Sequence, residues 1–135
     1  MALPKQLQLV LVTPERTLLD EPVDSLRLPL YDGQIGILPG RAPVVGRLGY
    51  GELRISAAGR ERSYYIDGGF LQVKGAVVSV LTNRAIEAED VDAGEARAQL
   101  QAVLERVPTT DHEFAAKDRD QQRARRMLEL ANKSR

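Results

Sequence analysis

Apolar and polar residues alternate along the first part of the chain, up to about residue 88. Leu7, Leu9 and Leu11 alternate with less apolar neighbours, a period that is typical of a half-buried strand. Similar short runs cover residues 23–30, 34–38, 52–56, 62–66, 70–74 and 76–81. Glycine-containing turn signals lie between them, among them Asp32-Gly33, Pro39-Gly40, Ala58-Gly59 and Asp67-Gly68-Gly69. The pattern predicts eight to ten short antiparallel strands in a sandwich or barrel, without helical crossovers.

The period changes near residue 89, where the pattern becomes helical. One stripe with helical spacing consists of Ala96, Leu100, Val103, Leu104 and Val107. Asp92 and Glu95 have the spacing of a capping box before this helix, and Pro108 is expected to end it. Thr110 and Glu113 form a second capping box, which opens a helix that continues to about residue 132. The short connection predicts an antiparallel helical hairpin. We therefore expect a β-domain over residues 1–88 and a hairpin over residues 89–135.

The second predicted helix has little apolar surface. Residues 117–123 contain no apolar side chain, and an isolated helix of this kind is marginal in water. We therefore expect a hairpin that is held by a modest free energy and that a partner could displace. Acidic residues dominate positions 87–113 and basic residues dominate positions 114–135. Two interpretations remain open: two solvated helices that attract each other, or a basic helix that also binds an acidic partner segment.

Composition narrows the classes of function. The 135 residues carry 19 basic and 19 acidic side chains, so net charge gives no argument for nucleic acid or anionic lipid. There is no cysteine, which excludes disulfides and thiolate metal sites. The first fifteen residues are interpreted as a strand region and not as a signal peptide, and no apolar run is long enough to span a membrane.

Candidate chemistry is sparse. His112 is the only histidine and is expected in the hairpin turn beside Asp111 and Glu113, where it supports no nucleophile pair and cannot build a His-rich metal site. The six aromatic residues are scattered and form no stacking platform for nucleic acid. We expect no catalytic residue, no cofactor and no metal. A ligand-binding β-sandwich, such as a carbohydrate module, is the alternative from another class, but it would need exposed aromatics that this chain largely lacks. A hydrolase on a sandwich is a more distant alternative.

Several segments in order resemble the epsilon subunit of the F-type ATP synthase, which is called delta in mitochondria. The most specific segment is Asp32-Gly33-Gln34-Ile35-Gly36-Ile37-Leu38-Pro39-Gly40-Arg41-Ala42-Pro43. The others are Val12-Thr13-Pro14-Glu15, Gly51-Glu52-Leu53-Arg54-Ile55, Gly68-Gly69-Phe70-Leu71-Gln72-Val73 and Ala88-Glu89-Asp90-Val91-Asp92. The resemblance covers nearly the whole chain. It implies a β-sandwich of about ten strands that is followed by a C-terminal helical hairpin.

The resemblance also implies partners and a location. The sandwich would bind the gamma subunit and touch the membrane rotor ring through a loop that contains Gln34, Gly40, Arg41, Ala42 and Pro43. The hairpin would extend toward the catalytic alpha and beta subunits and restrain ATP hydrolysis. The basic helix would then face acidic segments of those subunits. The side chains on its facing surface would be Arg119, Arg123, Arg125 and Arg126. The protein would be peripheral, on the cytoplasmic face of the bacterial plasma membrane, with no nucleic-acid partner.

Some bacterial members of this family bind ATP in the folded hairpin through an (Ile/Leu)-Asp-x-x-Arg-Ala motif. The matching candidates are Val91, Asp92 and Ala96, together with Arg123 of the second helix. Glu95 stands in the arginine position, where a carboxylate would repel phosphate. Arg97 lies two positions on, about 200° around a helix. We therefore expect ATP binding to be weak or absent.

Overall fold

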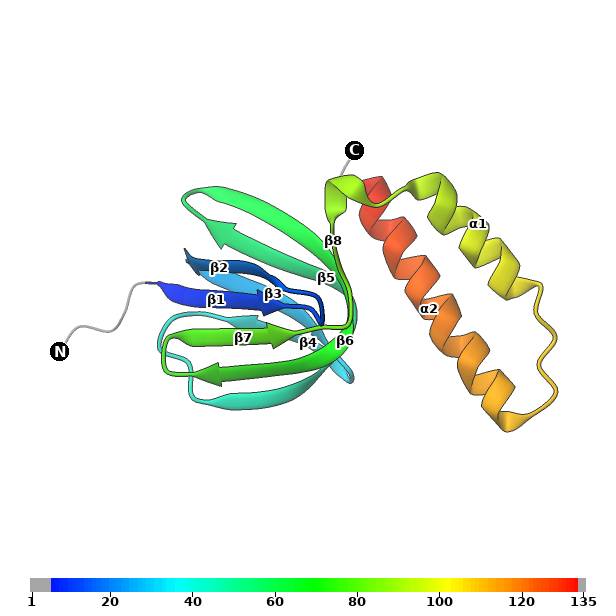
Figure 1. The fold of residues 1–135 in the computed structure, drawn as a ribbon, viewed down its shortest axis with the longest axis horizontal. Helices are drawn as coiled ribbons and strands as arrows, with labels where there is room; N and C mark the ends of the chain where they lie inside the picture. Colours follow the sequence, from blue (N-terminus) through cyan, green and yellow to red (C-terminus); the bar gives the residue numbers. More distant parts are fainter. Residues whose placement is uncertain (1–5, 134–135) are drawn as a thin grey trace.

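The computed structural model describes residues 6–133, a β-domain followed by two helices (Figure 1). Residues 1–5 of the predicted β-domain and residues 134–135 of the predicted hairpin lie outside the described residues. The strands are β1 (Leu7–Val12), β2 (Thr17–Val23), β3 (Ser25–Leu30), β4 (Gly33–Ile37), β5 (Val44–Ala57), β6 (Arg60–Lys74), β7 (Val77–Leu81) and β8 (Ala85–Glu87). A short 3₁₀ helix (Ala88–Asp90) then leads to α1 (Ala93–Leu104) and α2 (Asp111–Lys133).

The described residues form eight strands, within the eight to ten that the alternating pattern predicts and fewer than the ten or so that the resemblance implies. Their order is β2-β1-β7-β6-β5-β3-β4, and β8 pairs with β6. The difference arises because β5 and β6 are 14 and 15 residues long and pair with each other over most of their length. Asp67-Gly68-Gly69, predicted as a turn, lies inside β6. The sheet is mostly antiparallel, as predicted, but β1 and β7 run parallel.

Glycines inside the long strands allow close backbone contact. A side chain at Gly49 would place its Cβ 2.6 Å from the carbonyl oxygen of Leu30. At Gly69, where φ is +109°, a Cβ would collide with the backbone carbonyl of Leu81. These positions require glycine because neighbouring strands approach closely there. The glycines therefore do not mark turns.

The strands enclose one apolar core. Alternate residues of β1 point inward, and Leu7, Leu9 and Leu11 are almost completely buried, as their spacing predicts. They pack with buried side chains from the other strands, including Leu28, Leu53, Ile55, Ile66, Leu71, Val78 and Val80. This core makes the β-domain a stable body on which the hairpin can dock.

Both predicted capping sites are present. The carboxylate of Asp92 accepts a hydrogen bond from the Glu95 backbone N–H at 3.0 Å, which caps α1. At the start of α2, the Thr110 hydroxyl accepts from the Glu113 N–H at 3.1 Å, and the Glu113 carboxylate accepts from the Thr110 N–H at 3.2 Å. The spacing of these residues therefore predicts both helix starts correctly.

The predicted end of the first helix is wrong. Helix α1 ends at Leu104, and Val107, a member of the predicted apolar stripe, is 84% exposed. Lys117 of α2 donates from Nζ to the carbonyl oxygen of Arg106 at 2.9 Å, which fixes the chain just after the helix in a non-helical path. Pro108 also disfavours the helical conformation of the residue before it. Val107 therefore lies in the connection between the two helices.

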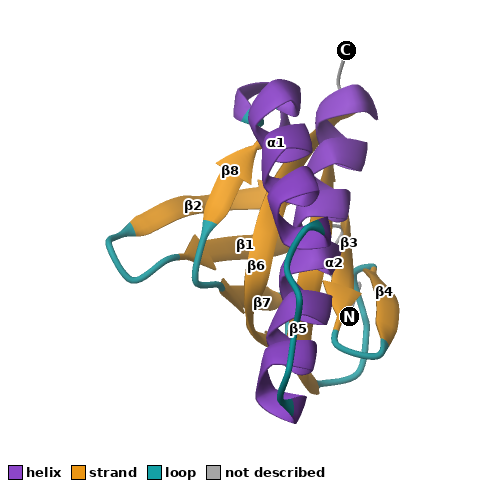
Figure 2. Cartoon of the chain, turned by 90° about the vertical axis from the view of Figure 1, so that its right-hand side faces the viewer, coloured by secondary structure: helices purple, strands orange, loops and turns teal. Residues whose placement is uncertain are grey.

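Helix α2 lies between α1 and the β-domain (Figure 1), and both helices run side by side in front of β5 and β6 (Figure 2). A second, smaller apolar cluster holds them there. It contains Tyr65, Ala88, Val91, Ala93, Ala96, Met127, Leu130 and Ala131. Alanine supplies four of these eight side chains, so the apolar contact between hairpin and sheet is small.

Candidate functional site

Four side chains on β5 and β6 form a surface that faces the hairpin. Tyr50 is paired with Asp67, and Glu52 is paired with Tyr65, in the register of the two strands. Side chains of a strand alternate between its faces, and Tyr64 and Ile66 enter the core of the β-domain. Tyr50, Glu52, Tyr65 and Asp67 therefore lie on the opposite face. We call these four residues the docking platform.

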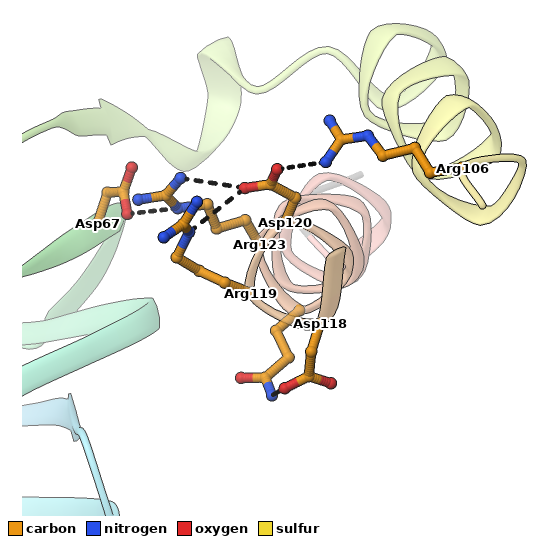
Figure 3. Close-up of polar contacts among 7 residues, drawn as sticks. Asp67, Arg106, Asp118, Arg119, Asp120 and Arg123 are labelled. Carbon is orange, nitrogen blue, oxygen red and sulfur yellow. Dashed lines mark hydrogen bonds and ion pairs between the residues drawn. The ribbon is translucent and has the colours of Figure 1, made fainter. Parts of the chain in front are cut away.

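Arg123 is the main contact of α2 with the docking platform (Figure 3). Its Nε donates to Oδ1 of Asp67 at 3.0 Å, and its guanidinium lies 4.7 Å from the centroid of the Tyr50 ring. Burial by itself would lower the pKa of Arg123, but the charge of Asp67 opposes it and the pKa is raised. Arg123 thus stays charged at the boundary between the sheet and the helix, where a desolvated ion pair is more strongly coupled than one in water.

The charge network continues from Arg123 into the segment that follows α1 (Figure 3). Asp120 accepts from Nη1 of Arg123 at 3.4 Å and from Nη1 of Arg106 at 2.6 Å. The hydrogen bond from Arg106 is the main reason that the pKa of Asp120 is lowered. The two arms of the hairpin and β6 are therefore joined by a continuous series of opposite charges.

A second ionic contact lies at the C-terminal end of α2. Lys133 donates to Oε1 of Glu52 at 3.2 Å, Ser63 donates to Oε2 at 2.6 Å, and Arg54 lies 3.3 Å from the same carboxylate. Burial alone would raise the pKa of Glu52, but these hydrogen bonds and nearby positive charges bring it below its ordinary value. Glu52 is therefore ionised under neutral conditions and holds the end of the hairpin.

Tyr65 completes the docking platform and is buried between the sheet and the hairpin. Its side chain is 1% exposed, and the hydroxyl has no hydrogen-bond partner among the described residues. Burial raises its pKa well above the ordinary value, so the hydroxyl stays neutral. An unpartnered hydroxyl in such a position opposes burial.

The structure places the predicted basic residues of α2 in two groups. Arg123 is occupied by Asp67 and Asp120, as described above. Arg119, Arg125 and Arg126 lie on the exposed surface of the helix. Arg126 forms only a solvent-exposed pair with Glu129, at 3.3 Å, and such pairs contribute little to stability. Arg119 lies 3.6 Å from Oδ1 of Asp120, but its side chain is still exposed (Figure 3). All three side chains are therefore exposed while the hairpin is docked, whereas Arg123 is held against the sheet.

The candidate ATP residues have structural roles in the docked hairpin. Val91 and Ala96 are buried in the second apolar cluster, and Asp92 caps α1. Arg123 is held by carboxylates. Glu95, in the position where the motif has arginine, is exposed. The expectation of weak or absent ATP binding thus remains a prediction.

The predicted rotor-ring loop is exposed. Gln34 lies on β4, and Gly40, Arg41, Ala42 and Pro43 lie between β4 and β5. Nη1 of Arg41 reaches the carbonyl oxygen of Gly36 at 3.5 Å, a weak contact that leaves the guanidinium at the surface. Its role in binding remains a prediction.

Sequence reasoning missed an exposed row of side chains on four strands and on the connection that follows β3. The ring of Tyr31 lies 4.7 Å from the guanidinium of Arg47, which is paired with Phe70; Phe70 is paired with Leu81, and Leu81 with Val12. Tyr31, Phe70 and Leu81 are 72%, 62% and 48% exposed. Aromatic residues and arginine are the side chains that contribute most at protein interfaces. The strand register, which the sequence does not give, brings them together.

The described residues contain no candidate cluster of metal ligands and no candidate membrane-spanning helix. Within residues 6–133, no three His, Asp or Glu side chains lie together in a way that could hold a metal ion. His112 is exposed in the first turn of α2. Neither helix is both long and apolar enough to cross a membrane. Fold and site together define a β-sandwich that carries a docked helical hairpin and exposes a row of aromatic, apolar and arginine side chains.

Comparison with known proteins identifies the family. Residues 6–88 match the family model of the ATP synthase delta/epsilon chain, β-sandwich domain. The ATP synthase epsilon chain of Rhodopirellula baltica is 45% identical over 119 residues, which cover 88% of this chain and 93% of the relative. The epsilon chain of a Synechococcus species is 38% identical over 122 residues, or 89% of each chain. The chain belongs to the ATP synthase epsilon-chain family, whose members are not catalytic subunits.

Solved structures share the fold. A chain in the Euglena gracilis mitochondrial ATP synthase (OSCP/F1/c-ring) superposes with a TM-score of 0.87 at 24% identity, over 97% of this chain and 84% of that chain. A chain of the Tetrahymena thermophila mitochondrial ATP synthase (central stalk/c-ring) gives a TM-score of 0.75 at 14% identity, over 97% and 99%. Sandwich and hairpin therefore recur together in distant ATP synthase chains.

Proposed function

We propose that the chain is a central-stalk subunit of a bacterial proton-translocating ATP synthase, at the cytoplasmic face of the plasma membrane. In this function the β-sandwich couples the gamma subunit to the membrane rotor ring, and the hairpin restrains ATP hydrolysis. Membership of the epsilon-chain family and the shared fold support assembly with the synthase.

The exposed row carries the proposed coupling role. An exposed apolar and aromatic strip on a rigid sheet is typical of a docking surface. Tyr31, Arg47, Phe70 and Leu81 lie on neighbouring strands or their ends, so they share one rigid support. We assign this row to gamma. The separate loop at Gly40–Arg41 is assigned to the rotor ring.

A single charge in the row tests this assignment. Replacing Phe70 with glutamate puts a charge into an apolar contact and is expected to weaken gamma binding by at least about tenfold, measured by titration calorimetry or by co-purification. Val107→Glu is the matched control, because Val107 is also exposed but lies in the hairpin connection. Equal binding by both variants and the unchanged chain would refute the assignment of this row.

The proposed regulatory role rests on the hairpin. Helix α2 is attached to the sheet by a small apolar cluster and two groups of ionic contacts, and it presents Arg119, Arg125 and Arg126 to solvent. We infer that acidic segments of the alpha and beta subunits bind this basic surface when the hairpin extends, and that the bound hairpin then resists rotation in the direction of hydrolysis.

Charge reversal at Arg119, Arg125 and Arg126 tests the regulatory role. Arg123 is left unchanged because it holds the docked hairpin. In a reconstituted complex of alpha, beta and gamma subunits, the triple glutamate variant is expected to bind as before and to allow ATP hydrolysis several times faster. A hydrolysis rate equal to that with the unchanged chain would remove the regulatory role and leave the coupling role intact.

A further inference from the structure

Two side chains of β6, two residues apart, face the docked hairpin and act on it in opposite directions. Tyr65 and Asp67 point away from the sandwich core because Tyr64 and Ile66, the alternating residues, point into it. Asp67 attracts Arg123 of α2, at 3.0 Å. Tyr65 packs in the cluster beneath both helices. The same strand therefore supplies an attraction and a penalty for docking.

Asp67 stabilises the docked state of the hairpin. Its side chain is 14% exposed and that of Arg123 is 35% exposed, so the pair is partly shielded from water. The Tyr50 ring covers the guanidinium, and a cation over an aromatic face is stabilised further. Releasing the hairpin separates Arg123 from both groups and exposes Asp67 to water.

The ring and the hydroxyl of Tyr65 have opposite effects on docking of the hairpin. Its ring gains apolar contact in the cluster that includes Met127 and Leu130, but its hydroxyl finds no partner among the described residues. Release of the hairpin returns this hydroxyl to water, which satisfies it. A buried donor without a partner typically disfavours the buried state by a factor of about 5 to 150. The hydroxyl therefore favours release, whereas the ring favours docking.

We propose that Tyr65 and Asp67 together set the fraction of molecules in which the hairpin is docked. The Asp67 carboxylate competes with any acidic partner for Arg123, and the Tyr65 hydroxyl keeps the docked state from becoming too stable to leave. The equilibrium itself belongs to the isolated chain; its effect on ATP hydrolysis rests on the proposed regulatory function.

Hydrogen exchange of the isolated full-length chain tests this proposal. Exchange of the α2 amides reports hairpin release, and exchange of the β1 and β7 amides reports global unfolding. The variant Tyr65→Phe keeps the ring and removes the hydroxyl, so α2 exchange is expected to slow by at least about fivefold. The variant Asp67→Asn keeps the shape and removes the charge, and α2 exchange is expected to rise by about fivefold.

Tyr64→Phe is the matched control. Tyr64 is the neighbouring buried tyrosine, but its hydroxyl donates to Glu87 at 3.2 Å. Removing a hydrogen bond that is made is expected to leave α2 exchange unchanged or to raise it, and not to slow it. The contrast between Tyr64→Phe and Tyr65→Phe therefore separates loss of an unpartnered hydroxyl from a general gain in hydrophobicity.

Specific outcomes would overturn the proposal. Unchanged or faster α2 exchange in Tyr65→Phe would show that the hydroxyl is satisfied in the docked state. Unchanged or slower exchange in Asp67→Asn would show that Arg123 does not depend on this carboxylate. The same variants, reconstituted with the catalytic subunits and gamma, distinguish the two proposals. Exchange that shifts as expected while hydrolysis stays constant supports the equilibrium and refutes the regulatory function.

Discussion

Glu52 shows how one residue ties a helix end to the sheet. Its carboxylate accepts from Lys133 and Ser63, and the neighbouring Arg54 adds a positive charge. Burial alone would raise the pKa of Glu52. The hydrogen bonds and positive charges outweigh burial and lower this pKa below its ordinary value of 4.5. A carboxyl group with a lowered pKa in the folded state contributes stability above its unfolded pKa and loses that contribution as the pH falls.

Acidification is therefore expected to weaken docking of the hairpin. The contribution of Glu52 is complete above about pH 4.5 and disappears as the pH falls through its lower folded-state pKa. Asp120, with a pKa lowered from 3.8, acts in the same direction. Urea unfolding at about pH 6 and about pH 3, followed by circular dichroism, measures the loss. Glu52→Gln should lose less stability between these pH values than the unchanged chain, and an equal loss would contradict this role of Glu52.

Gly69 is the residue whose replacement we expect to be most harmful in the sheet. Alanine there combines a positive φ with a collision against the backbone of Leu81, and we expect a loss of about 3 kcal/mol or more in unfolding free energy. Gly75 is the matched control, since its φ is +61° but no atom lies within 4 Å of the place that a Cβ would occupy. Gly75→Ala should cost only about 1–2 kcal/mol. Thermal unfolding of both variants measures the difference.

At the scale of elements, local sequence signals are sufficient for some features and insufficient for others. The capping residues Asp92 and Thr110 correctly predict both helix starts, because a cap depends on neighbours within one turn. The end of α1 could not be predicted in this way because Lys117, a residue of the other helix, binds the chain after Leu104. The sequence predicts several short strands where β5 and β6 are each one long strand. In sequence alone, a glycine at a close strand contact cannot be distinguished from a glycine in a turn.

The shortened α1 makes a prediction about two valines. Val103 is buried and Val107 is exposed, although both belong to the predicted apolar stripe. Aspartate at position 103 is expected to destabilise the hairpin by about 3 kcal/mol because it buries a charge without a partner. Aspartate at position 107 should change stability by less than about 0.5 kcal/mol. Helical ellipticity and exchange of the α1 amides check this, and equal effects would contradict the observed end of α1.

At the scale of the whole molecule, the two-part organisation and the family could be predicted from the sequence, but the docking platform could not. Tyr50 and Asp67 are far apart in the chain and meet only through the register of β5 and β6. Arg123 was predicted to face a partner, and in the docked hairpin it contacts Asp67. The exposed row was missed for the same reason, since outward and inward apolar residues are alike until the register is known.

The docked hairpin also gives a prediction about nucleotide. Asp92 and Arg123 are already engaged, and Glu95 is a carboxylate where the related motif has arginine. Calorimetry of the full chain with ATP is therefore expected to show no sub-millimolar binding. Sub-millimolar binding with an intact hairpin, judged from unchanged helical ellipticity, would contradict this prediction.

The parallel pairing of β1 with β7 has a consequence for synthesis on the ribosome. Strand β1 can pair with β2 as soon as both emerge, but its other edge has no partner until residues 77–81 are made. A nascent chain that is shorter than this exposes an apolar strand edge, which invites association with other chains. Closure of the sheet is thus a late event in translation, and premature release before β7 would yield a product prone to aggregation.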